Sequence, residues 1–193
     1  MRKLEPADLL TLEAYARERA AFRARVIEHK RARTVHLGAH VTLIFEDRLT
    51  IQYQIQEMLR IERIFEAPGI REELEAYNPL IPDGRNLKAT MLIEYADPEQ
   101  RALQLAQLNG IEHRIAFRIG DLAPVPAIAD EDLDRATSEK TSAVHFLRFE
   151  FSDAHVASLR AGSETTLAVD HPAYAGSAAL TDASRAALAA DFD

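Results

Sequence analysis

Four residues of this sequence that could bind a metal ion preferring nitrogen and oxygen ligands are Glu57, Glu62, His145 and His171. Glu57 and Glu62 lie about 140° apart around a regular helix, so one ion would not reach both. Helical carboxylate sites repeat Glu-x-x-His on partner helices, and the sequence does not contain this motif. The candidate metal ligands are therefore His145 and His171, although His145, on an apolar strand, also fits a core histidine. No cofactor is identified.

Anion recognition is a second kind of chemistry that the same region suggests. The Arg60 guanidinium suits a carboxylate or phosphate, and Gln56 lies about one turn away. An internal pair between Arg60 and Glu57 at i,i+3 is the stronger alternative. A small enzyme or a ligand-binding protein would combine polar residues of the helix with polar residues of nearby loops. The candidate binding residues are Gln56, Glu57, Arg60, Glu62, Tyr77, Asn78, His171 and Tyr174.

Half of these candidate residues lie within residues 49–66. The spacing of the apolar residues in this stretch favours a helix. At 100° per residue, Ile51, Ile55 and Met58 fall on one face, and Glu62 projects from the middle of that apolar stripe. Because a buried carboxylate is costly without a partner, we expect a basic or metal partner beside Glu62. The first residues also alternate as in a strand, but no Gly or Pro separates them from the helix-forming residues that follow.

The remaining elements predict a single α+β domain over residues 1–193, with a mixed or mainly antiparallel sheet of about five to six strands. This sheet would pack against the long central helix and several shorter helices. An amphipathic N-terminal helix is expected over 1–33, and an irregular acidic excursion over 121–141. Stretches that read as extended or as strands are residues 34–45 (interrupted at Gly38), 88–95, 115–119, 143–151 and 165–169. A loop of small residues is expected after Tyr174.

Composition bounds the classes of function. The 193 residues include no Cys, which excludes disulfides, thiolate nucleophiles and an iron–sulfur cluster held by the chain's own thiolates. No apolar run is long enough to span a membrane and no signal-peptide pattern opens the chain, so a cytoplasmic location is the default. The net charge is −8, although residues 1–40 carry nine Lys and Arg against five acids. Because the whole chain is acidic, the composition argues against nucleic-acid binding.

Several short motifs are distributed along the chain: Phe45-Glu46-Asp47-Arg48, residues 54–62, Tyr77-Asn78-Pro79-Leu80-Ile81-Pro82, Ala89-Thr90, Ile93-Glu94 and His171-Pro172-Ala173-Tyr174. Together they resemble a bacterial family, the domain of unknown function numbered 3501. The resemblance covers nearly the whole chain, and Gln-x-Gln-Glu-Met-Leu-Arg at 54–60 is its most specific part. One departure is Asp47, where the family pattern leads us to expect Asn, which puts the turn chemistry there in question.

The resemblance implies no activity. It implies a redox context, because genes of this family often neighbour those for an iron–sulfur oxidoreductase and a rubrerythrin-like protein. Our first hypothesis is therefore a cytosolic accessory or binding protein that acts with such a redox partner, which would hold the cofactor. The second is the enzyme or ligand-binding protein described above, which would use a buried Glu/Arg/His cluster. A third interpretation is a homodimer formed through the amphipathic N-terminal helix.

Overall fold

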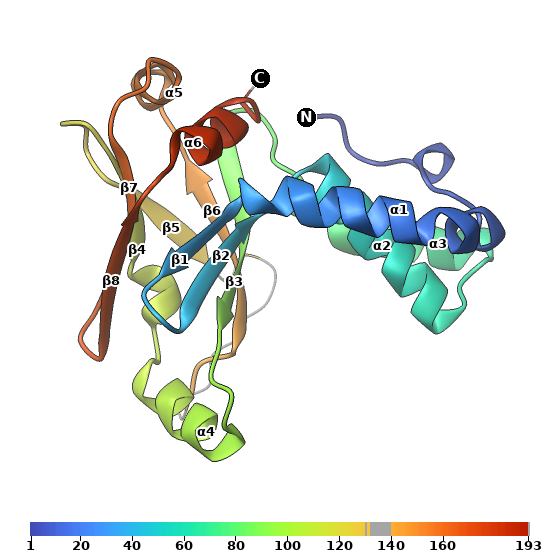
Figure 1. The fold of residues 1–193 in the computed structure, drawn as a ribbon, viewed down its shortest axis with the longest axis horizontal. Helices are drawn as coiled ribbons and strands as arrows, with labels where there is room; N and C mark the ends of the chain where they lie inside the picture. Colours follow the sequence, from blue (N-terminus) through green and yellow to red (C-terminus); the bar gives the residue numbers. More distant parts are fainter. Residues whose placement is uncertain (130, 132–139, 193) are drawn as a thin grey trace.

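The computed structural model describes residues 1–129, 131 and 140–192. These residues form an antiparallel sheet curled into a nearly closed barrel, and three helices project from the barrel as an arm (Figure 1). The α+β prediction is confirmed. The expected strand number of about five to six is too low, because the described residues form eight strands in one sheet.

The strand order in the barrel is β1-β2-β3-β6-β5-β4-β7-β8, and every neighbouring pair is antiparallel. The strands are β1 (Thr34–Leu37), β2 (Val41–Phe45), β3 (Asn86–Ile93), β4 (Ile115–Ile119), β5 (Val125–Ala129), β6 (Val144–Glu150), β7 (Thr165–His171) and β8 (Tyr174–Ala179). Successive side chains of a strand point to opposite faces. In β3, Leu87 and Met91 are buried in the barrel core, whereas Lys88 is only partly buried on the outer face.

The two end strands, β1 and β8, approach each other and nearly close the barrel. The Tyr174 hydroxyl donates to the Leu37 carbonyl (2.5 Å) and accepts from the His40 amide (3.1 Å). A Cβ atom on Gly176 would lie 3.1 Å from the Leu37 carbonyl carbon. Glycine at this position therefore permits the two backbones to approach this closely.

Two of these strands lie where the sequence predicted none. β5 falls inside the stretch expected to be irregular (121–141), of which residues 130 and 132–139 lie outside the described residues. β8 replaces the expected loop of small residues. Both segments lack the run of β-branched and aromatic residues that favours a strand. Pairing with neighbours decided their conformation, since β5 pairs with β4 and β6, and β8 with β7.

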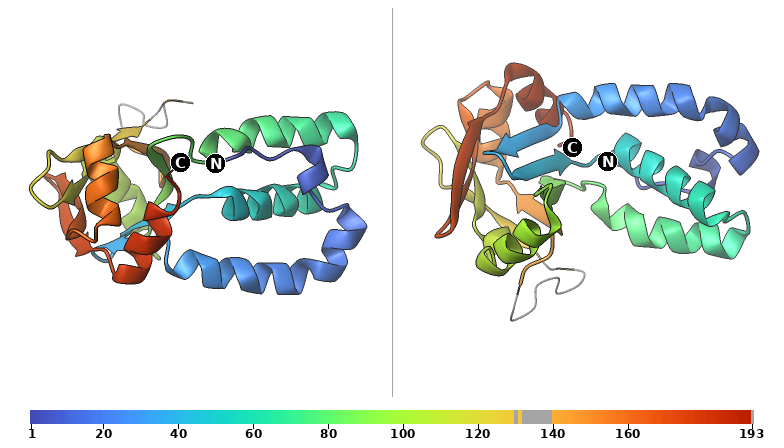
Figure 2. Two further views of the ribbon diagram at one scale, coloured as in Figure 1. Left: turned by 90° about the horizontal axis from the view of Figure 1, so that it is seen from above. Right: turned by 60° about the horizontal axis from the view of Figure 1, so that its bottom comes forward.

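The helices divide between the arm and the ends of the barrel. They are α1 (Leu12–Arg31), α2 (Arg48–Glu62), α3 (Ala67–Tyr77), α4 (Pro98–Gln107), α5 (Asp153–Arg160) and α6 (Asp182–Ala189), with 3-10 turns η1 (Pro6–Asp8), η2 (Asn78–Leu80) and η3 (Ile111–His113). α1, α2 and α3 lie side by side in the arm (Figure 2). Figure 1 shows α4 at one end of the barrel, with α5 and α6 at the other. No helix in the described ranges combines the length and apolar composition needed to cross a bilayer.

The N-terminal helix begins later than expected. Pro6 starts the separate turn η1, and α1 begins only at Leu12, where the Thr11 hydroxyl accepts a hydrogen bond from the Ala14 amide (3.2 Å). The apolar face of α1, including Phe22, packs on α2 within the same chain. Phe22 and Val26, on the face that suggested a homodimer, are therefore buried within the arm.

The helix predicted within 49–66 is confirmed as α2, but it does not pack on the sheet. It lies between α1 and α3, where Ile51 and Ile55 pack in one cluster with Leu74. On its other side Tyr53 stacks on Phe22, with ring centroids 6.0 Å apart. The helix that the sequence predicted to pack on the sheet is thus the middle helix of the arm. Its two apolar sides are covered by α1 and α3.

The predicted burial of Glu62 is wrong. Glu62 is the last residue of α2, and Arg63 ends the helix in the left-handed region (φ 57°). Glu62 is exposed, as are its neighbours Ile61 (61% exposed) and Phe65 (73%). The apolar stripe therefore extends beyond the residues that cover it, and the carboxylate stays in solvent.

A buried cluster of charged residues joins the arm to the barrel. The Arg33 guanidinium donates to both carboxylate oxygens of Asp191 (2.6 and 2.7 Å), and its Nε lies 3.1 Å from Asp47. Burial lowers the pKa of Arg33, but the hydrogen bonds and charge of Asp191, with the charge of Asp47, raise it above its ordinary value. Beside this pair, the buried Glu46 accepts hydrogen bonds from the hydroxyls of Thr50 (2.5 Å) and Thr90 (2.7 Å).

Asp47, the one departure from the expected motif, has two roles in this buried charged cluster, which forms the joint between arm and barrel. Its side chain accepts from the Thr50 amide (2.9 Å) and so caps the N-terminus of α2. The same carboxylate lies 2.5 Å from His29 Nε2. An amide at position 47 would supply the cap without the negative charge that faces Arg33.

Candidate functional site

The predicted site residues on α2 tie the arm together. The Glu57 carboxylate accepts one hydrogen bond from the Tyr15 hydroxyl (2.6 Å) and two from the Arg19 guanidinium (2.7 and 2.8 Å). Arg60 donates to the same carboxylate (3.3 Å), which is the internal pair that the sequence offered as the alternative to anion binding. The Arg19 hydrogen bonds, with those from Tyr15 and Arg60, lower the pKa of Glu57 to about 2.

This pKa predicts a loss of stability in acid. The unfolded chain binds a proton at Glu57 near its ordinary pKa of 4.5, and the folded chain only near 2. The stabilisation is therefore fully present above pH 4.5 and is lost as the pH falls toward 2. Glu57→Gln should lower the free energy of unfolding by about 2 kcal/mol at neutral pH, and by much less near pH 2. Urea unfolding followed by circular dichroism tests this.

Glu13→Gln is the matched control for that prediction, because Glu13 pairs with Arg17 (2.8 Å) on the exposed side of α1. This variant should change stability by less than about 0.5 kcal/mol at either pH. A stability difference between the native chain and Glu57→Gln that is the same at neutral and acid pH would contradict the assignment.

Gln56 and Asn78 hold the N-terminal segment against the arm. The Gln56 amide accepts from the Leu10 backbone N–H (2.6 Å) and donates to the Leu10 carbonyl (3.2 Å). Asn78 makes the same pair of bonds to the backbone of Leu4 (2.8 and 2.9 Å). Each amide thus satisfies one backbone donor and one acceptor, which is a structural role.

His171 and Tyr174 lie on β7 and β8, at the closing seam of the barrel, and Glu62 lies at the far end of α2. His171 Nε2 is 3.2 Å from the Asn109 carbonyl, and Tyr174 bonds the backbone of β1 as described above. The structure therefore distributes the eight candidate binding residues over the arm and the barrel seam, and does not bring them together.

The candidate metal ligands occupy different surroundings. His145 is fully buried on β6, with Nε2 2.8 Å from the Thr141 hydroxyl and 3.8 Å from Glu112. His171 is on β7. Within residues 1–129, 131 and 140–192, no group of three or more His, Cys, Asp or Glu side chains is arranged to hold a metal ion. His145 fits the core-histidine alternative.

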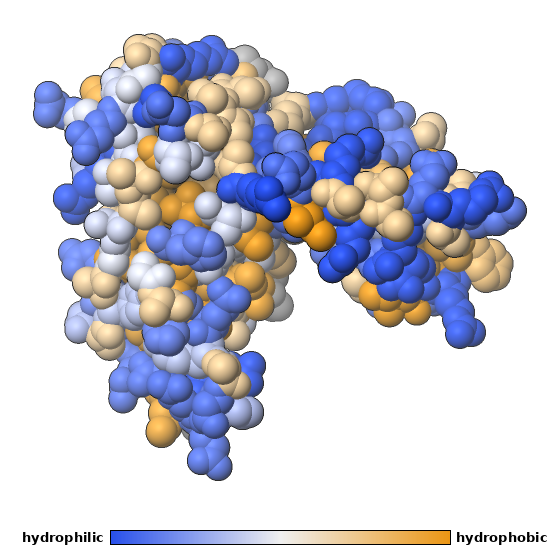
Figure 3. Space-filling view, in the orientation of Figure 1, coloured by the Kyte–Doolittle hydropathy of each residue, from blue (hydrophilic) through white to orange (hydrophobic). Residues whose placement is uncertain are grey.

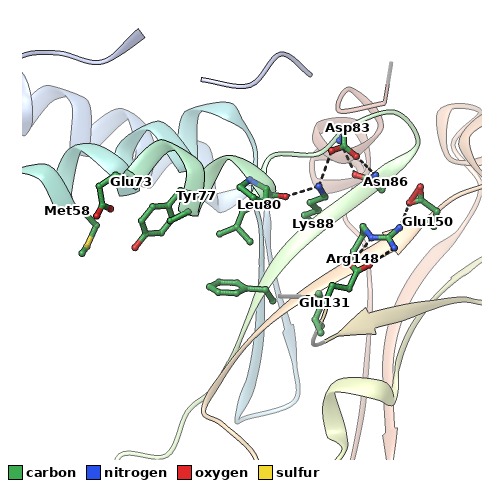
Figure 4. Close-up of a pocket in the computed structure, with 14 residues that line it drawn as sticks. Met58, Glu73, Tyr77, Leu80, Asp83, Asn86, Lys88, Glu131, Arg148 and Glu150 are labelled. Atoms are coloured by element: carbon green, nitrogen blue, oxygen red, sulfur yellow. Dashed lines mark hydrogen bonds and ion pairs between the residues drawn. The ribbon is translucent and has the colours of Figure 1, made fainter. Parts of the chain in front are cut away.

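A pocket of about 770 Å³ lies where the arm meets the outer face of β3 and β6. We call it the arm–barrel pocket. Figure 3 shows the recess between arm and barrel, and Figure 4 shows the lining side chains. Its apolar lining among the described residues includes Met58, Ala76, Tyr77, Pro79, Leu80 and Phe146, and Leu147, which is buried in the barrel core, also borders it. Its polar lining consists of Glu73, Asp83, Asn86, Lys88, Glu131, Arg148 and Glu150.

The barrel wall of the pocket carries two adjacent cations, Lys88 and Arg148, which are paired across β3 and β6. Like charges at this spacing repel, so both require acceptors. The Lys88 ammonium donates to two backbone carbonyls (2.7 and 3.2 Å) and to Asp83 (3.2 Å). Arg148 donates to both oxygens of Glu131 (2.7 and 2.8 Å) and to Glu150 (2.8 Å). Both cations therefore have acceptors within this chain, and the Asp83 carboxylate is shared between Lys88 and Lys3 (3.0 Å).

The arm wall carries a half-buried carboxylate, Glu73. It lies four residues before Tyr77 on α3, so both side chains are on the face of the helix that lines the pocket. Figure 4 shows them beside Met58, across the pocket from Lys88 and Arg148. Burial raises the pKa of Glu73, and the negative charges of Glu62 and Glu72 act in the same direction. The part of the chain that the structure describes provides no hydrogen bond or ion pair to this carboxylate.

Tyr77 is the one predicted site residue in this lining, and the sequence reasoning missed the others. Two signals were present. Arg148 and Glu150 interrupt an otherwise largely apolar strand face at 143–151, and Glu73 shares a helix face with Tyr77. Neither signal reveals that α3 and β6 face each other, because that placement depends on how the arm meets the barrel.

Comparison with known proteins identifies the family of this chain and a similar solved structure. A search of the curated proteins gave no match. The chain is similar to a solved structure described as a novel protein of unknown function from Burkholderia pseudomallei K96243, with 55% identity, complete coverage of both chains and a TM-score of 0.95. The family model described as Protein of unknown function (DUF3501) matches residues 3–192. The resemblance noted in the sequence is thereby confirmed, and this chain belongs to the DUF3501 family.

Proposed function

We propose that this protein binds a small organic molecule in the arm–barrel pocket. Ligand pockets typically enclose about 300–1,000 Å³ and combine apolar walls with a few polar groups. The arm–barrel pocket has this size, and its apolar side chains come from both walls, as with Tyr77 on the arm and Phe146 on the barrel. The observation that carries the proposal is this combination of volume and lining at the meeting of two structural units.

The three methionines of the chain provide an internally controlled test. Met58 lines the pocket, Met91 is fully buried in the barrel core, and Met1 is at the N-terminus. With ¹³C-labelled methionine methyl groups, titration with neutral 4-phenyl-1-butanol should shift the Met58 methyl resonance and leave that of Met91 unchanged. A Met58 resonance that does not move at millimolar probe concentrations would contradict the proposal.

A variant that fills the pocket should abolish this shift. Ala76 is exposed on α3 and lines the pocket, so Ala76→Trp occupies the space without removing a buried side chain. Ala24→Trp is the matched control, since Ala24 is exposed on α1 outside the lining. Loss of the Met58 response in the first variant and its retention in the second are expected. An equal response in both would contradict binding in the pocket.

We further propose, on the similarity to the family and the redox context that it implies, that the protein is an accessory partner of an iron–sulfur or rubrerythrin-type protein. The absence of Cys supports a division in which the partner holds the cofactor. The tagged full-length chain should recover such a protein from a native lysate of a bacterium that encodes it, and an unrelated tagged protein should not. Failure to recover any iron–sulfur or di-iron protein would contradict this proposal.

A further inference from the structure

We infer that the ligand of the arm–barrel pocket carries an ammonium group on an apolar body, and that Glu73 binds this group. The inference rests on the proposed function, because it names the chemical class of the molecule that the pocket takes.

The lining is acidic. Among the described residues of the lining, four carboxylates (Glu73, Asp83, Glu131 and Glu150) face two cations (Lys88 and Arg148). Lys3, outside this lining, also pairs with Asp83 (3.0 Å), so the formal balance with Lys3 counted is −1. A recess lined by an excess of one charge concentrates ligands of the opposite charge. The pocket therefore favours a cation over an anion.

The partners of the two cations strengthen this preference. The three donors of Lys88 meet three acceptors, and Arg148 is held by Glu131 and Glu150. An anionic ligand would have to displace one of these carboxylates and leave it without its cation. A cationic ligand displaces none of these contacts.

Glu73 is the lining carboxylate that still needs a cation. It has no hydrogen bond or ion pair within the described residues, and its burial disfavours the charged form, as the direction of its pKa shows. An ammonium group would supply both the opposite charge and hydrogen-bond donors. Tyr77, one turn along α3, places an aromatic ring on the same face, and aromatic faces attract cations.

The apolar side chains beside Glu73 select the rest of the ligand. Met58 and Tyr77 flank it on the arm, and Leu80 continues the apolar surface toward the barrel (Figure 4). A compact hydrophilic cation would leave this surface in contact with water. A cation with an alkyl or aromatic body would cover it.

Three probes with the same skeleton and different charges test the inference: 4-phenylbutylammonium, 4-phenyl-1-butanol and 4-phenylbutyrate. Dissociation constants come from the Met58 methyl shift at neutral pH. The ammonium should bind about tenfold more tightly than the alcohol, and the carboxylate more weakly than the alcohol. Glu73→Gln should reduce the affinity for the ammonium to that for the alcohol, and leave the affinity for the alcohol unchanged.

Glu75→Gln is the control for that substitution, because Glu75 is an exposed carboxylate on α3 that does not line the pocket. It should retain the preference for the ammonium. Equal affinities of the native chain for ammonium and alcohol, or an unchanged preference in Glu73→Gln, would overturn the inference while the Met58 response to the alcohol upholds the proposed function. If none of the three probes shifts Met58, the proposed function fails and the inference with it.

Discussion

Asp191→Ala is expected to lower the free energy of unfolding by about 3–5 kcal/mol, because it leaves the buried Arg33 guanidinium without its main partner. Arg33 is 4% exposed and Asp191 3%. Asp47, which would remain 3.1 Å from Arg33 Nε, compensates only in part because His29 also lies against it. Removing one member of a buried ion pair costs far more than an exposed pair contributes.

Urea unfolding measured by circular dichroism checks this expectation. Asp182→Ala is the control, since Asp182 is also on α6 and pairs with Arg185 (2.7 Å), but its side chain is 94% exposed. That variant should lose less than about 1 kcal/mol. Similar losses for the two variants would show that the joint between arm and barrel does not depend on the buried pair.

Phe117→Ala is expected to destabilise the protein by a similar amount, about 3–5 kcal/mol. Phe117 is 1% exposed and lies at the centre of an aromatic cluster, with ring centroids 5.6 Å from Phe45, 4.9 Å from Phe149 and 5.4 Å from Phe151. Strands β2, β4 and β6 meet through these rings. Alanine would leave a cavity that rigid strands on several sides cannot fill.

Phe65→Ala is the control for the aromatic cluster, because it makes the same change at a residue that is 73% exposed. It should alter stability by no more than about 0.5 kcal/mol. Thermal unfolding followed by circular dichroism compares the two variants. A loss below about 1 kcal/mol for Phe117→Ala would mean that the barrel closes around the cavity and that the cluster contributes little.

Elements whose own residues carry a strong period were predictable. Residues 48–62 formed a helix because no Gly or Pro interrupts them and their apolar residues repeat at helical spacing. β3 followed from the alternation of its residues, and β6 from a segment that is largely apolar on both faces. In β6, Leu147 and Phe149 are inside the barrel whereas Arg148 faces outward. β8 was missed because its residues are small and its strand form depends on β7 beside it.

Glu62 illustrates why a helical wheel alone could not locate a site. The wheel placed Glu62 within an apolar stripe, but burial of that stripe depends on which helices cover it, and the last covered residue of α2 is Leu59. The missed residues illustrate the converse. Arg33 and Asp191 are 158 positions apart, so no local pattern links them.

The sequence by itself determined that this is an α+β protein without thiol chemistry, and favoured a helix within residues 49–66, because backbone propensity, hydrophobic period and composition act within a few residues. Only the tertiary structure decided that this helix belongs to an arm, that eight strands form the barrel, and that Glu73 on α3 faces Lys88 and Arg148 across a pocket. The physical reason is that burial and electrostatic environment depend on packing between segments far apart in the chain.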